Sequence, residues 1–154
     1  MNRQGPALVL PPAPHLPGRT PRPPEGFFEP LKIGLSATQS PAELASSTAF
    51  RSGLEAFHAG YYWEAHELWE AVWMYLPPAS AERQLLRGLI QLANAGLKRR
   101  MGRPAAALRI LALADAALAE ATGRNLPPIM NLTAEMLASL RAHAAAELAE
   151  KNAI

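Results

Sequence analysis

The sequence predicts an all-α protein, an antiparallel bundle of about five helices that follows a proline-rich N-terminal tail. Nine of the 15 prolines lie within the first thirty residues, where they disfavour helix and sheet. After Ser40 no strand-like alternation of apolar and polar residues occurs, and apolar residues recur with helical spacing between prolines and glycines. A chain of 154 residues that is 49% hydrophobic is long enough for one domain with a core.

Residues 1–38 are expected to form a largely irregular tail, and residues 39–154 a single helical domain. Proline fixes φ and lacks a backbone donor, so it favours extended structure in the tail. Two alternatives are open for this tail. It is either a solvated leader or a strap that docks Phe27 and Phe28 on the helical body or on a second subunit.

Each expected helix has a start or stop signal in the sequence. Ser40 and Glu43 can form a capping box at the start of the first helix. Pro77 ends the second helix, and Gly102 follows the third. The short connections favour antiparallel neighbours. The expected helices cover residues 41–58, 62–76, 80–101, 104–123 and 131–150.

The first two of these helices have the residue spacing of a tetratricopeptide (TPR) hairpin, in which small residues let two helices approach and an aromatic residue fills the groove. No second copy follows about 34 residues later, the length of one such repeat. A TPR-like hairpin within a bundle is therefore expected, and not a repeat array. The residues that fit this spacing are Gly53, Gly60, Tyr62, Ala65, Trp69 and Pro77.

The composition excludes several kinds of chemistry. The chain has no cysteine, which removes disulfides, thiolate nucleophiles and cysteine-ligated zinc and fits a cytoplasmic location. Any metal must therefore be held by histidine and carboxylate side chains. The formal net charge of +2 gives no strong nucleic-acid signal, and no apolar stretch is long enough to span a membrane.

The stretch GYYWEAHELWEAVW, residues 60–73, combines five aromatic residues, three carboxylates and a histidine. On a helical wheel, His66 lies at the edge of the apolar stripe that would face the core. Glu70 follows His66 at i, i+4, and Glu67 lies within i, i+3 of Glu70, so the three side chains can interact. Glu64 is expected to face solvent.

The expected third helix has a polar edge that complements the second. Arg87 and Gln91 follow each other at i, i+4 on this edge. If the two helices pack antiparallel, this polar edge would lie beside His66 and Glu70. Buried polar groups there would have to form hydrogen bonds with one another. The predicted binding pocket between the two helices is lined by Tyr62, Trp73, Arg87 and Gln91.

The same stretch, followed by RGLIQLANAGLKRRMG, resembles the bacterial and archaeal helical family called Domain of Unknown Function 309. The family motif H-x-x-x-E-x-x-W/Y is met by His66, Glu70 and Trp73, and the resemblance covers about residues 50–118. It implies a helical fold and a metal-binding or hydrolase role at the motif, in a family with no established activity.

His66 and Glu70 are the candidate metal ligands, because H-E-L-W-E resembles the zincin motif H-E-x-x-H with Glu70 in place of the second histidine. Catalytic zinc usually has three protein ligands, so the alternative is a structural hydrogen-bonded pair. The two helix faces offer no serine, threonine or cysteine nucleophile. Catalysis would then use acid–base chemistry by His66, Glu70 and Glu67, or a metal-activated water. Two further carboxylate–histidine pairs would contribute only if packing brought them close: Glu55 with His58, and His143 with Glu147.

A non-catalytic interaction module is the alternative function. Eight of the ten aromatic residues fall between Phe50 and Tyr75, and a homodimer through Trp63, Met74 or Tyr75 is one form of this alternative. The residues imply no cofactor other than a divalent metal, and they define neither a substrate nor a small-molecule ligand. Nucleic-acid binding is not favoured, because the helix dipole accounts for a cluster of cations at a helix C-terminus. That cluster comprises Lys98, Arg99, Arg100 and Arg103.

Overall fold

The computed structural model describes the backbone of residues 6–152 and the side chains of residues 6–146. This part of the chain contains seven α-helices and no strand, which confirms the prediction of an all-α fold. Within the same residues, no helix combines the length and the hydropathy needed to cross a membrane. The helices are α1 (Glu29–Lys32), α2 (Pro41–Ala45), α3 (Thr48–His58), α4 (Tyr62–Trp73), α5 (Ala81–Arg100), α6 (Pro104–Arg124) and α7 (Ala134–Asn152).

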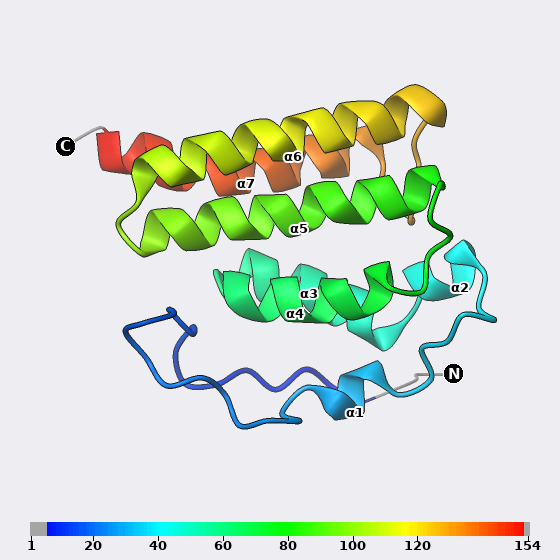
Figure 1. Cartoon of the computed structure of the whole chain (residues 1–154), viewed down its shortest axis with the longest axis horizontal. Coiled ribbons are helices and arrows are strands. Elements are labelled where there is room, and N and C mark those ends of the chain that lie inside the picture. Colours follow the sequence, from blue (N-terminus) through cyan, green and yellow to red (C-terminus); the bar gives the residue numbers. More distant parts are fainter. Residues whose placement is uncertain (1–5, 153–154) are drawn as a thin grey trace.

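The central helix of the fold is α5. Figure 1 shows it between α4 on one side and the pair α6 and α7 on the other, with α3 beside α4. Its buried residues run from Ala81 to Leu97 and include consecutive positions such as Leu85 and Leu86, so they occupy more than one side of the helix. A helix that is apolar on several sides must be covered by several partners. This explains why α4, α6 and α7 all pack against it.

Glycines allow α4 to lie very close to both of its neighbours. A Cβ atom built on Gly53 of α3 would lie 2.3 Å from Nε1 of Trp69, and one built on Gly96 of α5 would lie 2.8 Å from the ring of Tyr62. Both aromatic residues belong to α4 and are fully buried. The Nε1–H of Trp69 also donates a hydrogen bond to the backbone oxygen of Phe50, at 3.3 Å. These contacts fix how α4 is rotated about its own axis.

The first expected helix is wrong in one respect, because it is two helices. The capping box of Ser40 and Glu43 is present and begins α2, but that helix ends at Ala45. Ser47 then caps α3, accepting a hydrogen bond from Phe50 N–H and donating its hydroxyl to the oxygen of Leu44. Serine side chains compete in this way with the helical backbone, which breaks a helix that the apolar spacing alone would continue.

The remaining expected helices are present with shifted ends. The second ends at Trp73 and continues to Leu76 as a turn, and the fourth extends to Arg124. The last begins at Ala134 and not at Asn131, because Met130 and Asn131 both have positive φ. Residues with positive φ cannot start a right-handed helix.

The N-terminal strap, defined here as residues 6–40, contains α1 and otherwise irregular backbone. Figure 1 shows it running beneath α3 and α4. Phe28 and Leu31 are buried against Leu68 of α4, and the hydroxyl of Tyr61 donates a hydrogen bond to the oxygen of Pro11, at 2.8 Å. Of the two alternatives for this segment, the docked strap describes it and the solvated leader does not.

The close approach at Gly53 predicts a sharp response to one added methyl group. We expect Gly53→Ala to lower the free energy of unfolding by about 2–3 kcal/mol, because the rigid ring of Trp69 occupies the space. The matched control is Gly123→Ala near the end of α6, where nothing lies within 4 Å of the added carbon. The control should raise the free energy of unfolding by up to about 1 kcal/mol through helix propensity. Urea denaturation measures both, and equal small effects would contradict the close approach.

Candidate functional site

The packing of α4 decides which of its side chains are available for chemistry. Tyr62, Ala65, Trp69 and Val72 are all buried in the main core. Successive residues of a helix are about 100° apart, so the edge beside this buried face carries His66, Glu67 and Glu70. The sequence prediction that these three side chains share one edge of the helix is therefore consistent with the observed rotation of α4.

His66, Glu67 and Glu70 form a compact cluster, which we call the His66 cluster. The Nε2 atom of His66 lies 3.1 Å from Oε2 of Glu70, and its Nδ1 atom lies 3.5 Å from Oε2 of Glu67. One donor atom from each residue lies within 4.8 Å of the others. Their side chains are 20%, 34% and 51% exposed, in sequence order. The cluster is thus shielded on the histidine side and open on the side of Glu70.

One atom of the His66 cluster, Nδ1 of His66, lacks a hydrogen-bond partner among the described residues. Nδ1 of His66 is shielded from solvent and makes no hydrogen bond to any residue in the described part of the chain. Its separation from Glu67 is short enough for an ion pair but lacks hydrogen-bond geometry. Buried polar atoms are nearly always paired, so this nitrogen departs from the usual pattern.

Two cavities adjoin the His66 cluster, and the strap supplies a wall of each. Glu67 and Glu70 line a cavity of about 360 Å³ together with Glu29 and Lys32 of α1. Glu67 also lines a cavity of about 550 Å³ that lies under the preceding part of the strap and includes Trp63. The exposed side of the cluster therefore faces partly open cavities that are large enough for a small molecule.

The expectation that Glu64 faces solvent is wrong, because its side chain is fully buried, at 0% exposure. The strap covers the side of α4 that a helical wheel assigns to solvent. Oε2 of Glu64 accepts a hydrogen bond from the backbone N–H of His15 at 2.9 Å, and Oε1 has no hydrogen-bond partner among the described residues. The ring of His15 packs edge-on against Trp63 with centroids 4.7 Å apart. Burial raises the pKa of Glu64, and the His15 hydrogen bond offsets only part of this effect.

The residues predicted to line a pocket between α4 and α5 have other partners. Tyr62 is buried, its hydroxyl lies 3.3 Å from Nδ1 of His143, and burial raises its pKa. The guanidinium of Arg83 stacks 3.9 Å from the ring centroid of Trp73. Gln91 accepts a hydrogen bond from Asn94, and Arg87 is exposed to solvent. The structure brings His66, Glu67 and Glu70 together, and no described contact adds these four residues to them.

Of the two further carboxylate–histidine pairs, the structure brings the two histidines together. The rings of His58 and His143 lie 5.5 Å apart, so α3 and α7 do meet at these histidines. Burial lowers the pKa of His143, whose Nδ1 is already engaged by Tyr62. Glu55 is exposed, and the side chain of Glu147 lies outside the described residues. His143 therefore acts as a packing residue of α7.

The fold and the His66 cluster define a class, an all-α protein with a histidine–carboxylate cluster on one helix. Residues 50–110 match the family described as Domain of unknown function (DUF309), which is the family that the sequence resembles. The matched segment runs from Phe50 in α3 to Ile110 in α6 and includes the whole His66 cluster. No curated protein and no solved structure matches the chain significantly.

The burial of Glu64 predicts a pH dependence of stability. Because burial raises the pKa of Glu64 above 4.5, the folded protein holds the proton more firmly than the unfolded chain does. The contribution of Glu64 to stability is therefore fully present below pH 4.5 and is lost as the pH rises through the folded-state pKa. Glu64→Gln keeps an oxygen to accept from His15 and cannot ionise, so it should remove this loss.

Unfolding free energies measured across the acidic and neutral pH range test this prediction. Glu55→Gln, at an exposed position of α3, is the control for removing one carboxylate, and it should leave the slope above pH 4.5 as in the unmodified protein. A profile for Glu64→Gln that ran parallel to the unmodified protein would contradict the shifted pKa of Glu64.

Proposed function

We propose that the protein binds a divalent transition-metal ion through His66, Glu67 and Glu70. The observation that carries this proposal is the mutual spacing of their donor atoms, which lie within 4.8 Å of one another. Nitrogen and oxygen ligands bind such ions at about 2.0–2.2 Å, so two ligands on one ion lie at most about 4.4 Å apart. Small side-chain rotations would therefore bring the three donors onto one ion.

The chemistry of the donors supports the same proposal. His66 would bind the ion through one ring nitrogen, either Nε2, which lies 3.1 Å from Glu70, or Nδ1, which lacks a hydrogen-bond partner among the described residues. Imidazole suits zinc and iron, and carboxylates suit manganese, so one imidazole with two carboxylates fits these three ions. Soft ions such as copper(I) prefer thiolates and thioethers, which the cluster does not offer.

The surroundings of the His66 cluster support hydrolysis as the reaction class. Three protein ligands leave at least one coordination position for water or substrate. A bound metal ion lowers the pKa of such a water or polarises a substrate oxygen. The cavity lined by Glu67 and Glu70 lies on the open side of the cluster and also contains Lys32, whose ammonium lies 3.5 Å from Glu29. Lys32 is the cation in this cavity that would meet an anionic group of a substrate.

Elemental analysis of untagged protein, purified without added metal or chelator, tests the proposal. We expect about one equivalent of zinc, manganese or iron per chain in the unmodified protein. His66→Ala and Glu70→Gln should lose it, because each removes one of three ligands. Glu67→Gln, which removes the third ligand, should lose it too, and Glu55→Gln on α3 should retain the metal.

The structural alternative makes the opposite prediction in the same experiment. If His66 and Glu70 only form a hydrogen-bonded pair, the unmodified protein contains no metal and takes none up on dialysis against these ions. Circular dichroism shows whether each variant is folded before its metal content is compared. Metal retained by folded His66→Ala would also overturn the proposed ligand set.

A homodimer is the second candidate function, and the exposure of Met74 favours it. Met74 is 62% exposed and lines the cavity beside α1 together with Tyr75. Trp63 is less suited to this contact, because His15 and Arg22 of the strap pack against its ring. We expect light scattering to give about twice the chain mass of 16.6 kDa, and Met74→Glu to reduce it to one chain. Leu126→Glu, at a more exposed position, is the control, and a mass near 16.6 kDa for the unmodified protein would contradict the dimer.

A further inference from the structure

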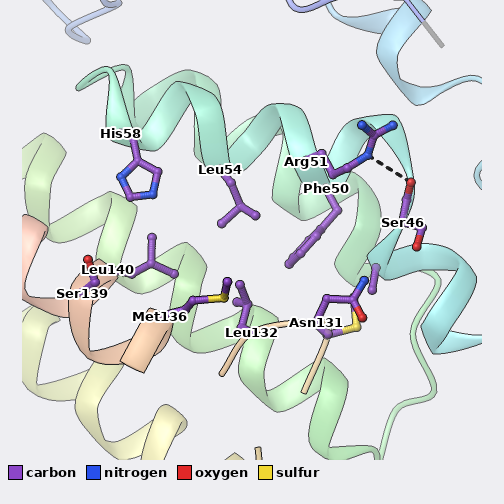
Figure 2. A pocket seen from close by; sticks show the side chains of 12 residues that line it. Ser46, Phe50, Arg51, Leu54, His58, Asn131, Leu132, Met136, Ser139 and Leu140 are labelled. Carbon is purple, nitrogen blue, oxygen red and sulfur yellow. Dashed lines mark hydrogen bonds between the residues drawn. The ribbon is translucent and has the colours of Figure 1, made fainter. Parts of the chain in front are cut away.

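A groove between α3 and α7, which we call the α3–α7 groove, lies apart from the His66 cluster. Its volume of about 330 Å³ falls in the range of small-molecule sites. Figure 2 shows Phe50 and Leu54 of α3 facing Met136 and Leu140 of α7 across the groove. The groove shares no lining residue with the cavities beside α4.

The groove exists because α3 and α7 pack on different helices. α3 packs on α4, and α7 packs on α5. The two helices meet near His58 and His143, whose rings lie 5.5 Å apart. Toward the N-terminal end of α3, the turn Ile129–Leu132 lies between the two helices and supplies Leu132 to the wall of the groove.

The turn that closes the groove is held in a costly conformation. Met130 and Asn131, its two central residues, have φ of 52° and 61°. Asparagine tolerates this region, whereas methionine rarely adopts it. Hydrogen bonds in both directions between Ile129 and Leu132 and the burial of Met130 hold the turn in place. Backbone held in this way is preorganised, so the shape of the groove does not depend on a ligand.

The two ends of the groove are polar, and the chemistry of its lining favours an anion. Arg51 and His58 are seven residues apart on α3, which places them about 10 Å from each other along the helix. The twelve residues that line the groove include no aspartate and no glutamate. A carboxylate therefore meets a cation and no negative charge in the groove, whereas an ammonium group would meet no partner of opposite charge.

Arg51 is free to receive a carboxylate. Its Nε–H donates to the backbone oxygen of Ser46 at 3.2 Å, and within the described residues its guanidinium forms no ion pair. Glu43 lines the adjoining cavity, but its carboxylate accepts a hydrogen bond from Ser40 N–H. Figure 2 shows the Arg51 guanidinium turned away from the groove and toward Ser46, so this exposed side chain would have to rotate to reach a bound anion.

We propose that the α3–α7 groove binds a medium-chain carboxylic acid, with its alkyl chain along the apolar walls and its carboxylate at Arg51. An extended chain of about eight carbons covers the distance of about 10 Å between the two polar ends. The apolar walls bury the methylene groups, and the guanidinium gives the carboxylate a charge-assisted hydrogen bond. Octanoate is the probe that matches both features.

Titration of octanoate into protein labelled with ¹³C at the methionine methyl groups tests the proposal. Met130 and Met136 line the groove, and Met74 and Met101 lie elsewhere. We expect saturable shifts of the two groove methyl signals, with the signals of Met74 and Met101 unchanged. Affinity should rise about threefold for each added methylene from butyrate to octanoate and then level off. Octylammonium should bind more weakly than octanoate.

Two pairs of matched variants separate the roles of charge and shape. Arg51→Gln should weaken octanoate binding about fivefold and leave 1-octanol binding unchanged. Arg109→Gln, on the exposed face of α6, should leave the binding of both probes unchanged. Ser139→Phe places a ring in the groove and should abolish binding of both probes. Ala138→Phe, at the adjacent exposed position outside the groove, should retain binding.

Several outcomes would overturn the proposal. These are an absence of saturable shifts at Met130 and Met136, shifts of equal size at Met74, Met101, Met130 and Met136, and equal affinities for octanoate and octylammonium. Equal effects of Arg51→Gln and Arg109→Gln would also overturn it, because octanoate would then respond only to net charge. If octanoate fails and an amphipathic peptide shifts the same two methyl signals, the groove binds a helix and the proposed ligand is wrong.

Discussion

The close packing of α4 against α3 and α5 is the constraint on which the rest of the structure depends. Trp69 and Tyr62 lie on one face of α4 and press against Gly53 and Gly96, where a side chain on either glycine would clash. These two contacts leave α4 a single rotation about its axis. A rotation of α4 by about 100° would carry His66, Glu67 and Glu70 together to another side, away from their present position beside the strap. The place of the His66 cluster beside the strap is therefore a product of helix packing.

The strap completes the environment that this rotation begins. Its residues wall both cavities beside the His66 cluster and bury the carboxylate of Glu64. Burying an ionised carboxylate costs free energy, and one backbone hydrogen bond from His15 offsets only part of that cost. The strap stays docked because Phe28 and Leu31 bury apolar surface against Leu68. Apolar burial at Phe28 and Leu31 thus offsets the cost of burying the carboxylate of Glu64 elsewhere under the strap.

The sequence predicted what depends on contacts within one helix. His66, Glu67 and Glu70 lie within one turn, so their proximity follows from helical geometry alone. Glu64 was misassigned because its environment comes from residues about 50 positions earlier, which no helical wheel includes. The break at Ser46 and Ser47 had a local signal in the capping preference of serine, and the apolar periodicity of residues 41–58 outweighed it. The α3–α7 groove had no local signal, since it arises from α3 and α7 packing on different partners.

Tyr62 connects the two regions for which we propose ligands. Tyr62 is the first residue of α4, the helix that carries the His66 cluster, and its ring fills the space at Gly96. Its hydroxyl contacts His143 on α7. The position of α7 also depends on Arg141, which forms two hydrogen bonds to Asp115 of α6. Burial lowers the pKa of His143, so acidification works against the docking of α7 and hence against the α3–α7 groove. The His66 cluster has no such dependence on α7, because its three residues lie on α4 and its cavities are walled by the strap. The two sites therefore share a scaffold residue and differ in the contacts that keep each one formed.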